Sequence, residues 1–124
     1  MAHPLLLSIV ELGGYPDFTS LYRAQGYDVV SVSSMRKAIS TIKKTAPEVI
    51  VTEFNFQSDF RDRTSSLESL MATLQGIDAD PRLIVFYESE FAPHFKRVQD
   101  RFEVHHALPF PVSEAQLRTC LATA

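Results

Sequence analysis

The chemistry-bearing residue that stands out in this sequence is Glu53, because it ends an apolar, β-branched run. The run covers residues 47–56 and reads Pro-Glu-Val-Ile-Val-Thr-Glu-Phe-Asn-Phe. A second carboxylate, Glu11, ends a similar run at residues 5–10. In an open parallel sheet, ligands bind outside the carboxyl ends of the strands. The two residues therefore predict an acidic pocket, but two carboxylates without a third protein ligand bind a cation only weakly. We expect no resident metal or other cofactor.

Three other side chains invite a catalytic interpretation, and the pattern argues against it. His105 and His106 are adjacent, so in a strand they point to opposite faces and cannot readily chelate one ion. Cys120 lies on the apolar stripe of the last predicted helix, where a buried, inert thiol is expected. A single cysteine also excludes an internal disulfide and a Cys-rich zinc site. Since no Ser-His-Asp, Cys-His or Lys-based constellation is evident, we predict that the protein is not an enzyme.

The elements that position these residues alternate between strand and helix. Apolar runs predict five strands, at residues 5–10, 28–33, 49–52, 83–87 and 104–108. Helical spacing and capping residues predict five helices, from Asp17 to Gly26, from Ser33 or Ser34 to Thr45, from Ser65 to Gly76, over residues 89–101, and from Ser113 onwards. Such alternation predicts an α/β, flavodoxin-like, doubly wound parallel sheet in three layers with strand order 2-1-3-4-5. Glu11 and Glu53 then meet at its switch point.

Composition sets further limits. The sequence has 124 residues, 45% hydrophobic and 22% charged, so we expect one domain over 1–124 with no output domain. A net charge of −3 and scattered basic pairs give no reason to expect nucleic-acid binding. The first apolar run is too short for a signal peptide, and no run is long enough to span a membrane. A cytoplasmic location is expected.

Three motifs, with their spacing along the chain, resemble the receiver domain of bacterial two-component response regulators, over essentially the whole chain. The first is Pro47-Glu48-Val49-Ile50-Val51-Thr52-Glu53, similar to the family's Pro-Asp run that ends in the phosphoacceptor aspartate. The second is Gly26-Tyr27-Asp28-Val29-Val30, similar to the start of strand two. The third is Leu108-Pro109-Phe110-Pro111-Val112-Ser113, in the place of the Lys-Pro-Phe segment before the last helix.

The resemblance implies phosphoryl transfer chemistry whose residues are largely missing. Glu53 stands at the phosphoacceptor position, one methylene longer than aspartate, and Leu12 follows Glu11 where the family has two acids for magnesium. The switch hydroxyl falls on Phe86 or Tyr87, of which Tyr87 is preferred, and the phosphate-binding lysine is Phe110. The aromatic switch position of strand five is Ala107. Phosphorylation of Glu53 is therefore not expected.

The resemblance further implies a degenerate pseudo-receiver that signals through a protein partner. Glu53 is then a solvated strand-end carboxylate, a fixed stand-in for a phosphorylated aspartate, or a vestige. The alternatives are an atypical phosphorelay receiver, phosphorylated on Glu53 or on a loop residue such as Asp59 or Asp62, and a flavodoxin-like enzyme or small-ligand domain. The loop after the first strand lacks the hydroxyl-rich cradle that a flavin needs.

Two more expectations follow from the resemblance. The peptide bond before Pro111 is predicted to be cis, since X–Pro is the one bond where the cis form costs little. The fourth helix, fifth strand and fifth helix form the usual partner or homodimer face of receivers. The apolar stripe placed on it here is Phe91, Phe95, Val98 and Phe102.

Overall fold

Ten regular elements and one short 3-10 turn form the fold in the computed structural model, which describes residues 4–10, 17–54, 66–77, 81–101 and 104–122. The strands are β1 (Leu5–Ile9), β2 (Asp28–Val32), β3 (Val49–Phe54), β4 (Arg82–Tyr87) and β5 (His106–Pro109). The helices are α1 (Thr19–Ala24), α2 (Met35–Lys44), α3 (Ser66–Gly76), α4 (Ala92–Arg101) and α5 (Glu114–Ala122), with the 3-10 turn η1 at Ser89–Phe91. The alternation matches the sequence prediction.

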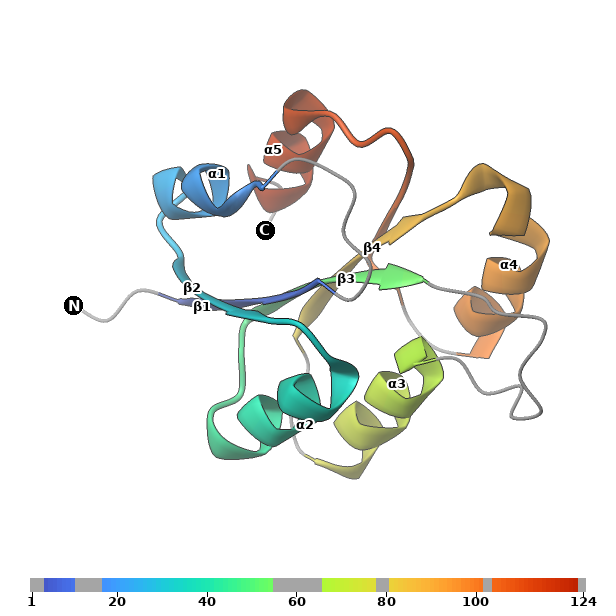
Figure 1. The fold of residues 1–124 in the computed structure, drawn as a ribbon, viewed down its shortest axis with the longest axis horizontal. Helices are drawn as coiled ribbons and strands as arrows, with labels where there is room; N and C mark the ends of the chain where they lie inside the picture. The colour runs from blue at the N-terminus through green and yellow to red at the C-terminus, as the bar shows by residue number, and fades with distance from the viewer. Residues whose placement is uncertain (1–3, 11–16, 55–65, 78–80, 102–103, 123–124) are drawn as a thin grey trace.

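The five strands form one parallel sheet in the order β2-β1-β3-β4-β5, as predicted. Helices α1 and α5 cover one face, and α2 and α3 cover the other (Figure 1). Helix α4 belongs to the second side, because its Phe95 and Val98 join the same core as α2 and α3. The chain is therefore a three-layer, flavodoxin-like fold. No helix in the described ranges is both long and apolar enough to cross a bilayer.

Strand alternation divides the interior into two cores. Successive side chains of a strand point to opposite faces, so Val49 and Val51 face α1 and α5, whereas Ile50 and Phe54 face α2, α3 and α4. Both faces of β3 are covered, and all six of its residues are buried. The edge strand β2 is covered less, and its Val30 is 37% exposed. Burial on both sides explains why β3 reads as a continuous apolar run.

Local signals account for most element ends. The backbone N–H of Lys37 donates to Ser34 Oγ at 3.2 Å, which caps α2 as predicted. The carboxylate of Asp17 accepts from the backbone N–H of Thr19 at 2.9 Å at the start of α1. Gly26 follows α1 with φ +93°, a conformation that residues with a Cβ rarely adopt.

Two of the boundaries that differ from prediction lie at the fourth helix and the fifth strand. The fourth helix begins as the 3-10 turn η1, closed by the Phe91 N–H donating to the Glu88 carbonyl at 2.9 Å, and becomes α-helical at Ala92. Pro93 then lies in the first turn of α4, where its missing N–H costs nothing. Strand β5 begins at His106, two residues later than expected, because it pairs with β4 only from Ile84 onwards.

Replacing Gly26 with Ala is expected to lower the free energy of unfolding by about 1–2 kcal/mol, because the new Cβ must occupy the left-handed region. Nothing lies within 4 Å of that Cβ, so the loss comes from the backbone alone. Urea unfolding measures it.

Gly76→Ala is the matched control. Its Cβ also meets nothing within 4 Å, but Gly76 ends α3 and has no positive φ, so this variant should be neutral or more stable by up to about 1 kcal/mol. Equal losses at the two glycines would contradict the conformational explanation.

Candidate functional site

Glu53 lies within strand β3 and not beyond its carboxyl end. Strand β3 continues through Glu53 to Phe54, two residues further than predicted, and Glu53 is only 2% exposed. The expectation of a solvated strand-end carboxylate is therefore wrong. In the structure, Glu53 and Phe54 both pair with residues of β4. The sequence pattern had placed the end of β3 just before Glu53.

The register of β3 and β4 decides which side chain lies beside Glu53. Glu53 pairs with Phe86, and Phe54 pairs with Tyr87. Laterally paired residues in a parallel sheet share a face, so Phe86 lies on the same face as Glu53 and Tyr87 on the opposite one. Of the two candidates for the switch position, the structure places Phe86 next to Glu53. Tyr87, the preferred candidate, instead joins the second core.

Aromatic rings pack around Phe86 on the Glu53 side of the sheet. Phe86 is completely buried, with its ring centroid 6.2 Å from that of Phe18 and 6.0 Å from that of Phe110, both in edge-to-face geometry. Phe110, at the position that the resemblance gives to a lysine, packs against the first core. Each such ring pair adds about 0.5–1.5 kcal/mol beyond its burial. We call Phe18, Phe86 and Phe110 the first aromatic cluster.

A second aromatic cluster, Phe54, Tyr87 and Phe95, lies on the opposite face at the same edge. The Phe95 centroid is 5.1 Å from that of Phe54 and 4.9 Å from that of Tyr87. It ties α4 to the ends of β3 and β4. The carboxyl ends of these two strands are thus packed with rings on both faces.

The second cluster corrects two residues of the predicted partner stripe. Phe95 is 1% exposed and Val98 2%, so both are core residues and offer no contact surface. Phe91 is half-buried, with its ring 6.5 Å from that of His94. Phe102 lies outside the described residues. The helical spacing of the stripe indicated a buried face, and the structure shows that Phe95 and Val98 are buried.

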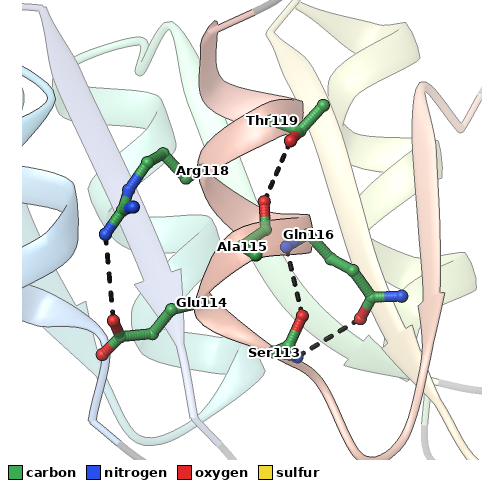
Figure 2. A network of polar contacts seen from close by, with 6 residues as sticks. All are labelled: Ser113, Glu114, Ala115, Gln116, Arg118 and Thr119. Carbon is green, nitrogen blue, oxygen red and sulfur yellow. Dashed lines mark hydrogen bonds and ion pairs between the residues drawn. The ribbon is translucent and has the colours of Figure 1, made fainter.

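The segment after β5 is fixed by a cis peptide and a capping box. The Phe110–Pro111 bond is cis, as predicted. Ser113 and Gln116 then cap α5 reciprocally: the Gln116 N–H donates to Ser113 Oγ at 3.2 Å, and the Ser113 N–H donates to Gln116 Oε1 at 3.3 Å (Figure 2). An ion pair between Arg118 and Glu114 at 3.9 Å follows on the exposed side of the helix. These contacts hold the turn that presents Phe110.

The hydroxyl of Thr52, the residue before Glu53 in β3, lies in apolar surroundings. Its side chain is fully buried, and its hydroxyl has no hydrogen-bond partner in the part of the chain that the structure describes. An unsatisfied buried hydroxyl costs about 1–3 kcal/mol.

The remaining candidates divide between structural roles and undescribed positions. Glu11, Leu12, Asp59 and Asp62 lie outside the described residues. Within the described ranges, no three His, Cys, Asp or Glu side chains are grouped as metal ligands.

His105 contributes to the sheet, and Cys120 contributes to the core. The backbone N–H of Leu83 donates to Nδ1 of His105 at 3.1 Å, and the His105 N–H donates to the Leu83 carbonyl at 3.1 Å, so His105 extends the β4–β5 pairing. Cys120 is buried in the first core, and burial raises the pKa of its thiol.

Arg82 makes contacts that the sequence did not indicate. One guanidinium nitrogen donates to the Cys120 carbonyl at 3.1 Å, and the other donates to the Tyr27 hydroxyl at 3.1 Å. These contacts join the start of β4 to α5 and to the turn before β2, at the sheet edge opposite Glu53. The partners are 38 and 55 residues away, so no local signal could have found them.

Comparison with known proteins finds similar solved structures but no matching family model or curated protein. Neither a protein-family model nor a curated protein matches the sequence. Among solved structures, the chain is similar to a response regulator receiver domain from Clostridium thermocellum, with 15% identity, a TM-score of 0.75, and coverage of 99% of this chain and 93% of that one. It is also similar to the chemotaxis protein CheY4 of Vibrio cholerae, with 17% identity, a TM-score of 0.75 and 98% of both chains covered. A receiver protein from Sinorhizobium medicae is 23% identical, with a TM-score of 0.70, and 98% of this chain and 93% of that one are covered. The chain has the fold of a response regulator receiver domain.

His106 generates a prediction about pH. Burial lowers the pKa of His106 from its ordinary value of 6.5, and the charges of Arg82 and His105 lower it further. Below pH 6.5 the unfolded chain therefore binds this proton more readily than the folded chain, so the folded state loses stability as the pH falls. We expect His106→Gln to lose less stability than the wild type between neutral and mildly acidic pH. Urea midpoints across that range measure the difference, and parallel curves for the two proteins would contradict it.

Proposed function

We propose that this chain is a receiver-like signal-transduction module that acts through protein–protein contacts and is not phosphorylated on Glu53. The observation that supports the proposal most strongly is the 2% exposure of Glu53 beside the fully buried Phe86. The fold similarity to receiver domains supports the signalling class. The module is proposed to be neither an enzyme nor a cofactor-binding protein, and to work in the cytoplasm.

The geometry works against phosphoryl transfer in two ways. A carboxylate nucleophile must be reached in line by the phosphoryl donor, and a cation must neutralise the charge that develops on the phosphoryl oxygens. Glu53 is closed off from solvent, so a donor has no direct approach. At the lysine position, the ring of Phe110 packs against Phe86 and supplies no positive charge.

The aromatic clusters also bear on how the module signals. A receiver that switches needs two alternative packing arrangements of the side chains at the carboxyl ends of its strands. Here the rings of Phe18 before α1, Phe86 of β4 and Phe110 before α5 pack on one face, and rings of β3, β4 and α4 pack on the other. Dense packing on both faces favours one conformation. We therefore propose that the partner recognises a surface that does not change shape, and that binding is not controlled by a conformational switch at Glu53. A fixed stand-in and a vestigial Glu53 are both compatible with this.

Treatment of the protein with acetyl phosphate and Mg²⁺ is expected to leave its intact mass unchanged, whereas a phosphoryl group adds about 80 Da. An ordinary phosphorylatable receiver treated in parallel shows that the donor is active. The same reaction on Glu53→Gln identifies the site of any label.

Uptake by the wild type that Glu53→Gln abolishes would overturn the proposal. Uptake by both proteins would favour the atypical receiver, with a loop carboxylate such as Asp59 or Asp62 as the acceptor. A visible absorption spectrum of the purified protein tests the flavodoxin-like alternative, since bound flavin gives colour and the proposal expects none.

A further inference from the structure

Helix α2 separates its side chains into an apolar inner face and an outer face whose charged residues are all basic. Met35, Ala38 and Ile42 are buried in the second core, with Ile39 partly buried against it. The exposed side chains include Arg36, Lys37, Lys43 and Lys44, which we call the α2 basic face, and Ser40 between them. Helix α2 is packed on the sheet face that it shares with α3 (Figure 1). The amphipathic pattern explains the inner residues but not the charge of the outer ones.

The four cations are arranged around one point. Side chains three or four positions apart are neighbours on a helix surface. Arg36 and Lys37 precede the exposed Ser40 by four and three residues, and Lys43 and Lys44 follow it by three and four. All four therefore border the Ser40 hydroxyl, which can donate to an acceptor oxygen. Their span along the axis, eight residues at 1.5 Å each, is about 12 Å.

Among the described residues, no ion pair neutralises this charge. Helix α2 contains no acidic residue, and none of the four cations forms an ion pair with a residue in the ranges that the structure describes. The helix carries +4, and the whole chain carries −3, so subtracting the helix leaves −7 for the other residues. The α2 basic face is thus a local positive region on an acidic protein.

The placement of two of the cations also opposes helix stability. Arg36 and Lys37 lie in the first turn of α2, where the positive end of the helix dipole favours acidic residues. No acidic residue occupies that turn. Cations that oppose local stability, with no compensating contact among the described residues, indicate a functional reason. An anionic ligand on this face would supply the missing compensation.

We propose that the α2 basic face binds a short acidic segment of a protein partner, whose carboxylates pair with the four cations around Ser40. The outer positions carry no large apolar side chain to insert into a bilayer, which disfavours a membrane surface. The face is compact and the rest of the chain is acidic, which disfavours a long polyanion such as nucleic acid. The proposal extends the proposed function by naming a partner's chemistry, and its test needs no phosphoryl donor, so the two can fail separately.

The test measures the binding of a fluorescein-labelled peptide of about eight glutamates by fluorescence anisotropy, with every variant at the same moderate salt concentration. The first variant carries Arg36→Gln, Lys37→Gln, Lys43→Gln and Lys44→Gln, and we expect its Kd to rise by about tenfold or more. The matched control carries Arg23→Gln, Lys96→Gln, Arg97→Gln and Arg118→Gln. These four exposed cations lie on α1, α4 and α5, so the net charge changes equally. The control should stay within about twofold of the wild type once the common charge effect is screened by moderate salt.

Two further measurements separate the face from general charge. Ser40→Glu places a carboxylate among the four cations and should weaken peptide binding more than Ser40→Gln. The thermal midpoint of the double variant Arg36→Gln and Lys37→Gln should equal or exceed that of the wild type, because both cations leave the first turn and the favourable last-turn lysines stay. A lower midpoint would contradict that reason for a functional role.

Three results would overturn the proposal. The wild type could fail to bind the peptide, or the α2 variant and the control could lose affinity equally. Tighter binding of the wild type to a duplex oligonucleotide or to vesicles of phosphatidylcholine and phosphatidylserine than to the peptide would assign the face to another class of partner.

Discussion

The parallel register of β3 and β4 is the constraint on which the rest of the candidate site depends. It pairs Glu53 with Phe86 and Phe54 with Tyr87, and so sends one aromatic ring of β4 to each face of the sheet edge. In a parallel sheet a shift by one residue would exchange these faces and put the phenol beside the carboxylate. The hydrophobic cores on both faces oppose such a shift, since Ile84 and Phe86 belong to one core and Leu83 and Val85 to the other.

From this register follow the two aromatic clusters that close the strand ends. The first joins Phe86 to Phe18 before α1 and to Phe110 before α5, and the second joins Tyr87 and Phe54 to Phe95 of α4. In the receiver fold this edge is where the resemblance places phosphate, metal and switch residues. Here the described part of that edge is filled by rings, with Glu53 buried beside them.

The sequence predicted the architecture well because its signals are local and redundant. Continuous apolar strands, helical spacing and the caps at Ser34 and Ser113 each point to the same alternation. The cis bond before Pro111 followed from the resemblance alone. The site was harder, because burial of Glu53 and the pairing of Phe86 depend on a register between two strands more than 25 residues apart in the chain. The helical stripe containing Phe95 and Val98 showed an apolar face but could not show that the core covers it completely. The contacts of Arg82 are of the same long-range kind.

The central claim is that the Glu53 carboxylate is closed to a phosphoryl group and its metal ion. NMR spectroscopy of protein labelled with ¹³C at the glutamate carboxyl carbon tests it directly, with Glu53→Gln identifying the Glu53 signal. Addition of beryllofluoride and Mg²⁺, which together mimic a phosphorylated carboxylate, is predicted to leave the Glu53 signal unmoved. A saturable shift of that signal, dependent on both reagents, would contradict the account.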